Sequence, residues 1–200
     1  MKRILMEDLG QVGDILEPSS DERRHLVNVR RISLDEEVEL IDGHGGLALA
    51  RVVETSKKVL RLEVTARPQE DRESQPRLGM VLAIPSQLST FDGMLPGLVQ
   101  LGVNHIYLVP TAWSGRIKKD PDRYLERVQG IMLQSLKQCG RLVLPKVQVM
   151  RNWQALCDEV EPWQTKLIYH PGGADEVPQD PEHAMLLEVP VDHTVSEIAA

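Results

Sequence analysis

The spacing of apolar residues before one charged segment differs from the spacing after it, and this difference constrains the fold more than any other feature. Residues 37–66 alternate between apolar and polar side chains, the pattern of strands with one buried face. Residues 78–84, LGMVLAI, are almost continuously apolar, as in a strand covered on both faces. Between them, residues 67–77 hold two prolines and six charged residues but no apolar side chain, which is typical of a linker. We therefore predict two domains, over residues 1–70 and 77–200.

The first predicted domain is small and rich in β structure. Ser19 and Glu22 have the spacing of a capping box, which predicts a short helix at about residues 20–30. The sequence DGHGG, residues 42–46, is typical of a tight turn, and further alternating strands follow it. Several short strands with this alternation favour a small antiparallel barrel or sandwich.

The second predicted domain alternates strands with helices. Pro121 and Gly140 have the positions expected at the start and just beyond the end of a long helix. Alternation of this kind predicts a parallel sheet with helical crossovers, so the fold class is α/β, or α+β with the first domain included. The expected elements are strands at 78–84 and 103–110, helices at 91–101, 121–139 and 152–160, and short strands at KVQVM, KLIYH and MLLEV.

The composition excludes several classes of protein. Hydrophobic residues make up 42% of the 200, and no apolar run approaches the roughly 18 residues of a membrane span. The N-terminus lacks the pattern of a signal peptide, so we expect a cytoplasmic protein. The two cysteines and six histidines are scattered, which predicts no disulfide and no metal. The net charge is −7, yet residues 110–150 carry eight Lys and Arg against three Asp and Glu, and phosphate binding needs only such a local excess.

Five basic side chains lie close together before the first alternating strand: Arg23, Arg24, His25, Arg30 and Arg31. One interpretation is a solvated helix surface that nearby carboxylates partly neutralise, and composition alone favours it. The other is a surface that binds phosphate groups. His25 is more simply a structural side chain than a metal ligand, because no other histidine lies at metal-binding spacing.

Two later segments also have two interpretations each. Arg116, Lys118 and Lys119 follow Trp113, and an aromatic ring beside cations can stack on a base while the cations hold its phosphate. A packed tryptophan beside a solvated basic loop is equally consistent. Residues 138–141, QCGR, end the long helix, where Gly and Arg suit a C-terminal cap. Cys139 in this segment has no neighbouring base to activate it as a nucleophile.

Three segments, in this order, resemble one family of enzymes. They are Lys2 and Arg3 followed by residues 25–45, HLVNVRRISLDEEVELIDGHG; LVQLGVNHIYLVP, residues 98–110; and QSLKQCGRLVLPKV, residues 134–147, in which Gln138, Cys139, Gly140, Arg141 and Pro145 match. Together they are similar to the 16S ribosomal RNA (uridine-N3) methyltransferases of the SPOUT class. In that family a PUA-like β-barrel precedes an α/β domain with a C-terminal knot.

The resemblance implies an S-adenosylmethionine-dependent methyltransferase of uridine N3 in 16S ribosomal RNA. It implies an RNA-binding, PUA-like barrel over residues 1–70 and a SPOUT-like methyltransferase domain over 77–200, a homodimer, and the small ribosomal subunit or its RNA as partner. Because N3 lies on the pairing edge of the base, the target must be unpaired or flipped out. The resemblance favours the phosphate-binding interpretation of the basic residues. The expected RNA contacts are Lys2, Arg3, Arg23, Arg30, Arg31, Arg116 and Arg141.

Several departures from the family's pattern leave a second interpretation open. Gly97 and Gln100 stand where the family has Lys and Glu, and Ala112-Trp113-Ser114 replaces its Glu-Arg-Ser. The Gly-Pro-Glu-Gly-Gly loop of the knot is expected beyond residue 200, so these 200 residues alone are expected to be inactive; HPGGAD, 170–175, is predicted to be an ordinary turn. The alternative is a non-catalytic RNA-binding or ribosome-associated relative. An unrelated two-domain enzyme is a third possibility, but no GxGxxG, P-loop or GxSxG motif supports it.

Overall fold

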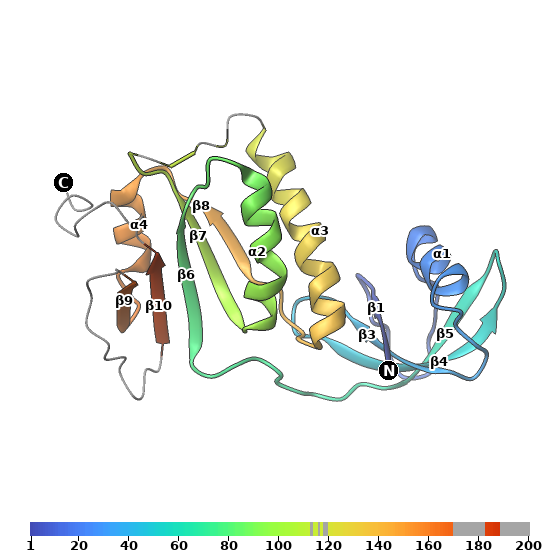
Figure 1. Cartoon of the computed structure of the whole chain (residues 1–200). Helices are drawn as coiled ribbons and strands as arrows, with labels where there is room; N and C mark the ends of the chain where they lie inside the picture. The colour runs from blue at the N-terminus through green and yellow to red at the C-terminus, as the bar shows by residue number, and fades with distance from the viewer. Residues whose placement is uncertain (113, 116, 118–119, 170–182, 189–200) are drawn as a thin grey trace. The chain divides into compact units, whose positions relative to one another are not determined.

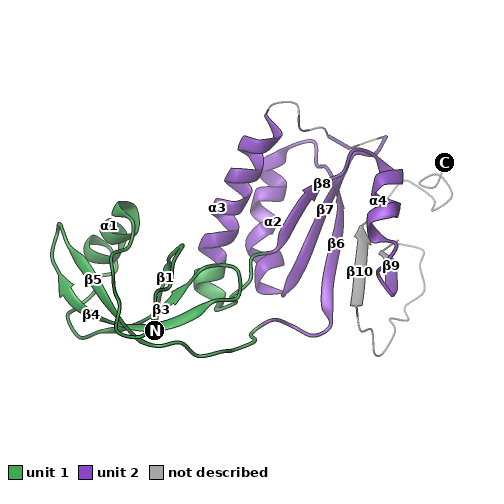
Figure 2. Cartoon of the chain, turned by 180° about the vertical axis from the view of Figure 1, so that it is seen from behind, with its two compact units in different colours: residues 1–72, 136–144 green, residues 73–135, 145–200 purple. Residues whose placement is uncertain are grey.

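The structure is a computed structural model, and it describes residues 1–112, 114–115, 117, 120–169 and 183–188 (Figure 1). The chain forms two compact units (Figure 2). Unit 1 consists of Met1–Arg72 and Leu136–Leu144, and unit 2 consists of Glu73–Ser135 and Pro145–Ala200. The predicted turn at residues 170–175 lies outside the described residues.

Unit 1 is built on a five-stranded sheet with the order β1-β3-β4-β5-β2. β3 (Glu37–Ile41), β4 (Leu47–Thr55) and β5 (Leu60–Ala66) form the antiparallel pairs that the alternation predicted. β2 (Ile15–Leu16) adds antiparallel to β5, whereas β1 (Lys2–Leu5) runs parallel to β3. The sheet is therefore mixed, and its parallel pair was not predicted.

The helix of unit 1, α1 (Ser20–Asn28), confirms the predicted capping residue. The Ser19 hydroxyl accepts a hydrogen bond from the Glu22 amide at 3.3 Å, as an N-cap side chain does. Leu26 and Ile32 are 2% and 6% exposed. They join the inward-facing residues of the strands in one hydrophobic cluster, whose removal from water is the main force that stabilises the unit. The other buried members are Ile4, Leu9, Val38, Leu40, Ala48, Ala50, Val52, Leu60, Leu62 and Val64.

Unit 2 contains a five-stranded sheet with the order β8-β7-β6-β10-β9, in which every neighbouring pair is parallel. The predicted α/β class is thus confirmed. The strands are β6 (Arg77–Ala83), β7 (Val103–Val109), β8 (Lys146–Val149), β9 (Thr165–Tyr169) and β10 (His183–Glu188). The chain runs from β6 towards one edge of the sheet and then returns from the other edge through β9, so the strand order breaks between β6 and β10.

Three helices accompany this sheet. α3 (Pro121–Cys139) begins and ends at the predicted residues, whereas α2 (Leu88–Gln100) begins three residues before the predicted start. α2 and α3 lie side by side in both views of the chain, and the Ser135 hydroxyl donates to the Pro96 carbonyl at 3.2 Å (Figures 1 and 2). α4 (Trp153–Val160) packs through its buried side chains on Val81, Tyr107 and Val109 of the sheet. No helix in the described part of the chain is long and apolar enough to cross a membrane.

Unit 1 also includes one segment from later in the chain. Residues 136–144, which lie in the middle of the second predicted domain, belong to unit 1. Their backbone bonds the turn between β3 and β4: the Gly45 amide donates to the Leu142 carbonyl at 3.0 Å, and the Leu144 amide donates to the Gly43 carbonyl at 2.8 Å. These bonds join residues about a hundred positions apart, and no local pattern in the sequence indicated them.

Candidate functional site

The carboxyl edge of the parallel sheet is the candidate ligand site in unit 2. In open parallel sheets, ligands bind beyond the carboxyl ends of the strands, at the point where the strand order changes direction. Here that point lies between β6 and β10. The residues that follow β6 are Ile84–Gln87, and those that follow β7 begin at Pro110.

Backbone hydrogen bonds hold these two loops together. The Ile84 amide donates to the Val109 carbonyl at 3.0 Å, and the Gly115 amide donates to the Ile84 carbonyl at 2.7 Å. A Cβ atom added at Gly115 would lie 2.8 Å from the carbonyl carbon of Pro85, closer than real Cβ contacts. Glycine is therefore required at position 115 for the close approach of the two backbones.

Thr111 is the chemically most notable residue of these loops. Its amide donates to the Ser114 hydroxyl at 2.7 Å, and that hydroxyl donates to the Thr111 carbonyl at 3.3 Å. The Thr111 hydroxyl oxygen itself is buried and has no hydrogen-bond partner among the residues that the structure describes. A buried polar atom without a partner is costly, so it suits a position where a ligand supplies the bond. No signal in the sequence singled out Thr111, because the burial of its hydroxyl arises only in the folded chain.

The expected RNA contacts fall into two groups once their partners are known. Arg30 and Arg31, at the end of α1, are exposed, and Arg23 within the helix is half-buried. No ion pair reaches any of these three side chains in the described part of the molecule. Arg24, on the same helix, lies 3.9 Å from the Asp21 carboxylate, and both side chains are well exposed. These residues of α1 and its end therefore offer cations to solvent.

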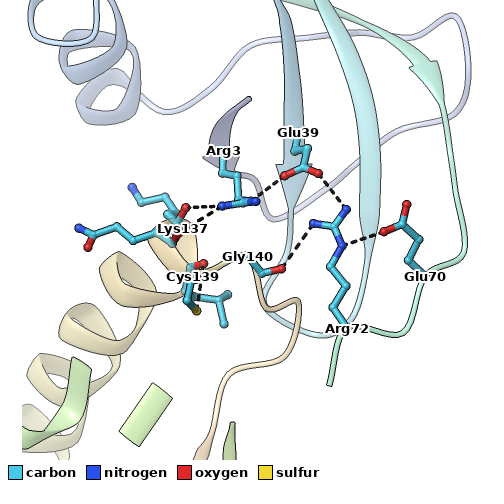
Figure 3. A network of polar contacts seen from close by, with 9 residues as sticks. Arg3, Glu39, Glu70, Arg72, Lys137, Cys139 and Gly140 are labelled. Carbon is cyan, nitrogen blue, oxygen red and sulfur yellow. Dashed lines mark hydrogen bonds and ion pairs between the residues drawn. The ribbon is translucent and has the colours of Figure 1, made fainter. Parts of the chain in front are cut away.

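Lys2 and Arg3, by contrast, are engaged within unit 1. Lys2 Nζ lies 2.7 Å from a Glu36 carboxylate oxygen. Arg3 Nε donates to the Glu39 carboxylate at 2.6 Å, and Arg3 Nη1 donates to the carbonyl oxygens of Lys137 at 3.1 Å and Gln138 at 3.4 Å (Figure 3). The Arg3 guanidinium thus caps the carbonyl end of α3, where a cation interacts favourably with the helix dipole. The charges of Lys2 and Arg3, two of the expected RNA contacts, are thus already paired with carboxylates.

Arg72 completes the network around Glu39. Arg72 Nη2 donates to Glu39 at 2.8 Å, Arg72 Nε to Glu70 at 2.7 Å, and Arg72 Nη1 to the Gly140 carbonyl at 3.4 Å (Figure 3). Gly140 has φ +86°, and a Cβ atom there would lie 2.9 Å from an Arg3 guanidinium nitrogen. The QCGR segment therefore serves as a helix end in this structure, as the cap interpretation predicted.

Two carboxyl groups of this region have shifted pKa values. Burial raises the pKa of Glu39, but hydrogen bonds from Arg72 and Arg3 and the charges of both arginines outweigh it, so the pKa of Glu39 lies below its usual value. Burial also raises the pKa of Glu36, but hydrogen bonds from Lys2 and from the Ser33 amide outweigh this effect. The pKa of Glu36 therefore lies below its usual value. Both carboxyl groups are thus held ionised by structural cations.

Arg141 is buried, unlike Arg30 and Arg31. The structure places Arg141 with only 6% of its surface exposed and with interactions inside the protein. This burial corrects the expectation that it is an accessible RNA contact, because a buried guanidinium cannot reach a phosphate without a rearrangement. Arg116 lies outside the described residues, as do Trp113, Lys118 and Lys119. No group of three or more His, Cys, Asp or Glu that could hold a metal occurs in the described ranges.

Two family models match the sequence. The family model described as "RNA methyltransferase PUA domain" matches residues 19–65, and the one described as "RNA methyltransferase domain" matches residues 72–189, more than half of the chain. The Ribosomal RNA small subunit methyltransferase E of Buchnera aphidicola is 24% identical over 165 residues, which are 76% of this chain and 61% of the relative. The protein of the same name from Helicobacter pylori is 32% identical over 131 residues, or 64% of this chain and 57% of the relative. The chain therefore spans about three-fifths of these relatives.

Solved structures have the same fold. A Ribosomal RNA small subunit methyltransferase E from Neisseria gonorrhoeae, bound to S-adenosyl methionine, superposes with a TM-score of 0.77 at 26% identity and covers 94% of this chain and 80% of its own. A Legionella pneumophila protein in complex with SAM gives a TM-score of 0.77 at 23% identity, with 92% and 78% covered, which supports the fold alone. The predicted PUA-like domain and SPOUT-type α/β fold are confirmed, and the chain belongs to the RNA methyltransferase family.

Proposed function

We propose that this protein is an S-adenosylmethionine-dependent methyltransferase that acts on ribosomal RNA. One observation carries the proposal: the RNA methyltransferase domain matches residues 72–189, the part of the chain that forms the parallel sheet with its break between β6 and β10. The names of the relatives support ribosomal RNA of the small subunit as the substrate. The uridine N3 atom as methyl acceptor, a homodimer and a cytoplasmic location are the finer parts of this proposal.

The carboxyl edge of the sheet offers groups that fit a methyl donor. S-adenosylmethionine supplies, when bound, a methyl group on a positively charged sulfur. The buried Thr111 hydroxyl would bond a polar group of the donor. The loop that contains it is tied to the loop after β6 by the bond from the Gly115 amide to the Ile84 carbonyl. These groups would bind and orient the donor, since such enzymes work mainly by holding two reactants in line.

Replacement of the Thr111 hydroxyl tests the proposed donor site. We expect Thr111→Val, which keeps the shape and removes the hydroxyl, to weaken S-adenosylmethionine binding about tenfold, the effect of one lost hydrogen bond of about 1.4 kcal/mol. Isothermal titration calorimetry of the complete protein measures it. Thr65→Val is the matched control, because Thr65 is an exposed residue of unit 1. Equal affinities of the two variants would remove Thr111 from the site, and absence of donor binding by the unaltered protein would contradict the proposed activity.

A non-catalytic RNA-binding relative remains the second candidate function. The surface of α2 favours it, because Gly97 and Gln100 are exposed at positions where the family resemblance leads one to expect Lys and Glu, and the space around Gly97 is open. The two functions differ in one measurement. Incubation of the complete protein with labelled S-adenosylmethionine and small ribosomal subunits, followed by mass spectrometry of the RNA, should show a methylated uridine if the enzyme is active. RNA binding without any methyl transfer or donor binding would establish the second function.

A further inference from the structure

The segment that follows α1 presents two kinds of side chain together on the surface of unit 1. Val29 and Leu34 are large apolar residues with 66% and 57% of their surface exposed. Arg30 and Arg31 lie between them in the chain and are also exposed. We call Val29, Arg30, Arg31 and Leu34 the basic–apolar ridge.

The backbone of the ridge is anchored, so its side chains are held outward. The amides of Val29 and Arg30 both donate to the His25 carbonyl at 3.0 Å, and the Ile32 amide donates to the Leu26 carbonyl at 3.1 Å. Ile32 lies between Arg31 and Leu34 in the chain, but its side chain is only 6% exposed and belongs to the hydrophobic core. The backbone of the ridge is therefore already ordered before a ligand binds, which lowers the entropic cost of binding.

The arginines of the ridge differ from Arg51 and Arg61 of unit 1 in their lack of acidic partners within the described residues. Arg51 pairs with Glu63 at 3.0 Å, and Arg61 pairs with Glu17 and Glu54, each at 2.9 Å. Within the described residues, neither Arg30 nor Arg31 has such a pair. Their charges are thus available to an anionic ligand.

We propose that the basic–apolar ridge binds unpaired RNA, with its arginines on phosphate groups and with Val29 and Leu34 against the faces of bases. This inference rests on the proposed function and names the form of RNA that the first unit takes. Phosphates alone would call for cations only, and two exposed aliphatic side chains would then have no partner. In a duplex the base faces are stacked and inaccessible, whereas unpaired nucleotides offer apolar faces and phosphates together. The match of the RNA methyltransferase PUA domain to residues 19–65 includes the whole ridge.

Two double variants separate the two kinds of contact. Val29→Ser/Leu34→Ser removes the apolar side chains and keeps both charges, whereas Arg30→Gln/Arg31→Gln removes the charges and keeps the apolar side chains. The matched controls are Val12→Ser/Ile15→Ser, at residues 62% and 52% exposed, and Lys57→Gln/Lys58→Gln, in the exposed turn between β4 and β5. Each complete protein is titrated into a fluorescein-labelled single-stranded RNA and into the duplex of the same sequence, and anisotropy is read at several salt concentrations.

The proposal predicts a distinct result for each variant. Val29→Ser/Leu34→Ser should weaken binding of the single strand roughly five- to tenfold, because apolar contact area is lost, and should leave its salt dependence unchanged. Arg30→Gln/Arg31→Gln should weaken binding and lower the slope of log affinity against log salt by about 1.4, since each phosphate contact on a single strand contributes about 0.7. Duplex binding should respond to the second variant alone.

Three outcomes would overturn the proposal, and they have different meanings. If Val29→Ser/Leu34→Ser binds the single strand as tightly as Val12→Ser/Ile15→Ser does, the aliphatic pair contacts no base and a protein partner becomes its explanation. If both ridge variants match their controls while the unaltered protein binds RNA, the RNA surface lies elsewhere and the proposed function stands. If the unaltered protein binds no RNA even at low salt, the proposed function fails together with this inference. Thermal unfolding of every variant, followed by circular dichroism, ensures that only folded proteins are compared.

Discussion

At the scale of single residues, Glu39 determines how one of the expected RNA contacts, Arg3, is used. Its carboxylate is buried at 7% exposure and accepts hydrogen bonds from both Arg3 and Arg72. A buried carboxylate needs such partners, because desolvation without them costs several kcal/mol. The same pairing withdraws Arg3 from solvent, and the cations of unit 1 that remain free are those without a nearby carboxylate.

The stability of the protein should depend on pH through Glu39. Because its folded-state pKa lies below the unfolded value near 4.5, the unfolded chain takes up the proton first as the pH falls. The stabilisation is therefore complete above about pH 4.5 and is lost as the pH falls through the lowered folded-state pKa. We expect Glu39→Gln to reduce the free energy of unfolding by about 2 kcal/mol at pH 7. Urea unfolding at pH 7, 4 and 3 should show the difference from the unaltered protein shrink only at the two lower pH values; a constant difference would contradict this origin.

At the scale of secondary-structure elements, close packing on the sheet of unit 2 requires glycine at position 79. A Cβ atom at Gly79 of β6 would lie 2.7 Å from the Trp163 ring. That ring also lies edge-on to His105 of β7, at a centroid distance of 5.6 Å. The indole thus lies close against β6, and this packing requires the absence of a side chain at position 79.

Gly79→Ala should destabilise unit 2 by about 1–3 kcal/mol, the usual cost of an extra carbon in a packed interior. Gly93→Ala is the matched control, because Gly93 lies in α2 with no atom within 4 Å of an added Cβ. Alanine there should stabilise by about 0.5–1 kcal/mol through its higher helix propensity. Guanidinium unfolding followed by tryptophan fluorescence measures both changes. Similar effects of the two substitutions would show that Trp163 does not constrain position 79.

At the scale of the whole molecule, the two units are not consecutive in sequence, because unit 1 includes residues 136–144. This segment supplies carbonyl partners for Arg3 and Arg72 and backbone partners for the turn at 43–45. It also supplies Lys137, whose ammonium donates to the Glu22 carboxylate at 2.9 Å. Unit 1 is therefore complete only when the chain has continued through α3.

A fragment of residues 1–72 should consequently be less stable than the same unit in the whole protein. We expect its unfolding midpoint in urea to fall well below that of the unit 1 transition in the full chain, since several hydrogen bonds worth about 1 kcal/mol each are absent. A peptide of residues 134–146 added in excess should raise the midpoint, as any ligand of the folded state does. A peptide with Lys137→Glu is the control, because a carboxylate there faces Glu22. A fragment that is fully stable without the peptide would contradict this role of the segment.

The sequence alone predicted the elements whose signals are local. Alternation predicted β3, β4 and β5, the serine at position 19 predicted the start of α1, and Pro121 predicted the start of α3. Local patterns could not predict the parallel pairing of β1 with β3 or the burial of the Thr111 hydroxyl beyond the end of β7. Both depend on which strands become neighbours, and strand order is a property of the assembled sheet.

The chain itself determined its class, its elements and its family, because periodicity, capping residues and motif spacing act over a few residues. Tertiary structure decided which charges remain available for binding. Arg3 meets Glu39, 36 residues away, and the Lys137 carbonyl, 134 residues away, whereas no ion pair within the described residues reaches Arg30 and Arg31. The physical reason is that a side chain's charge is neutralised by whatever the fold brings within hydrogen-bonding distance, irrespective of separation along the chain.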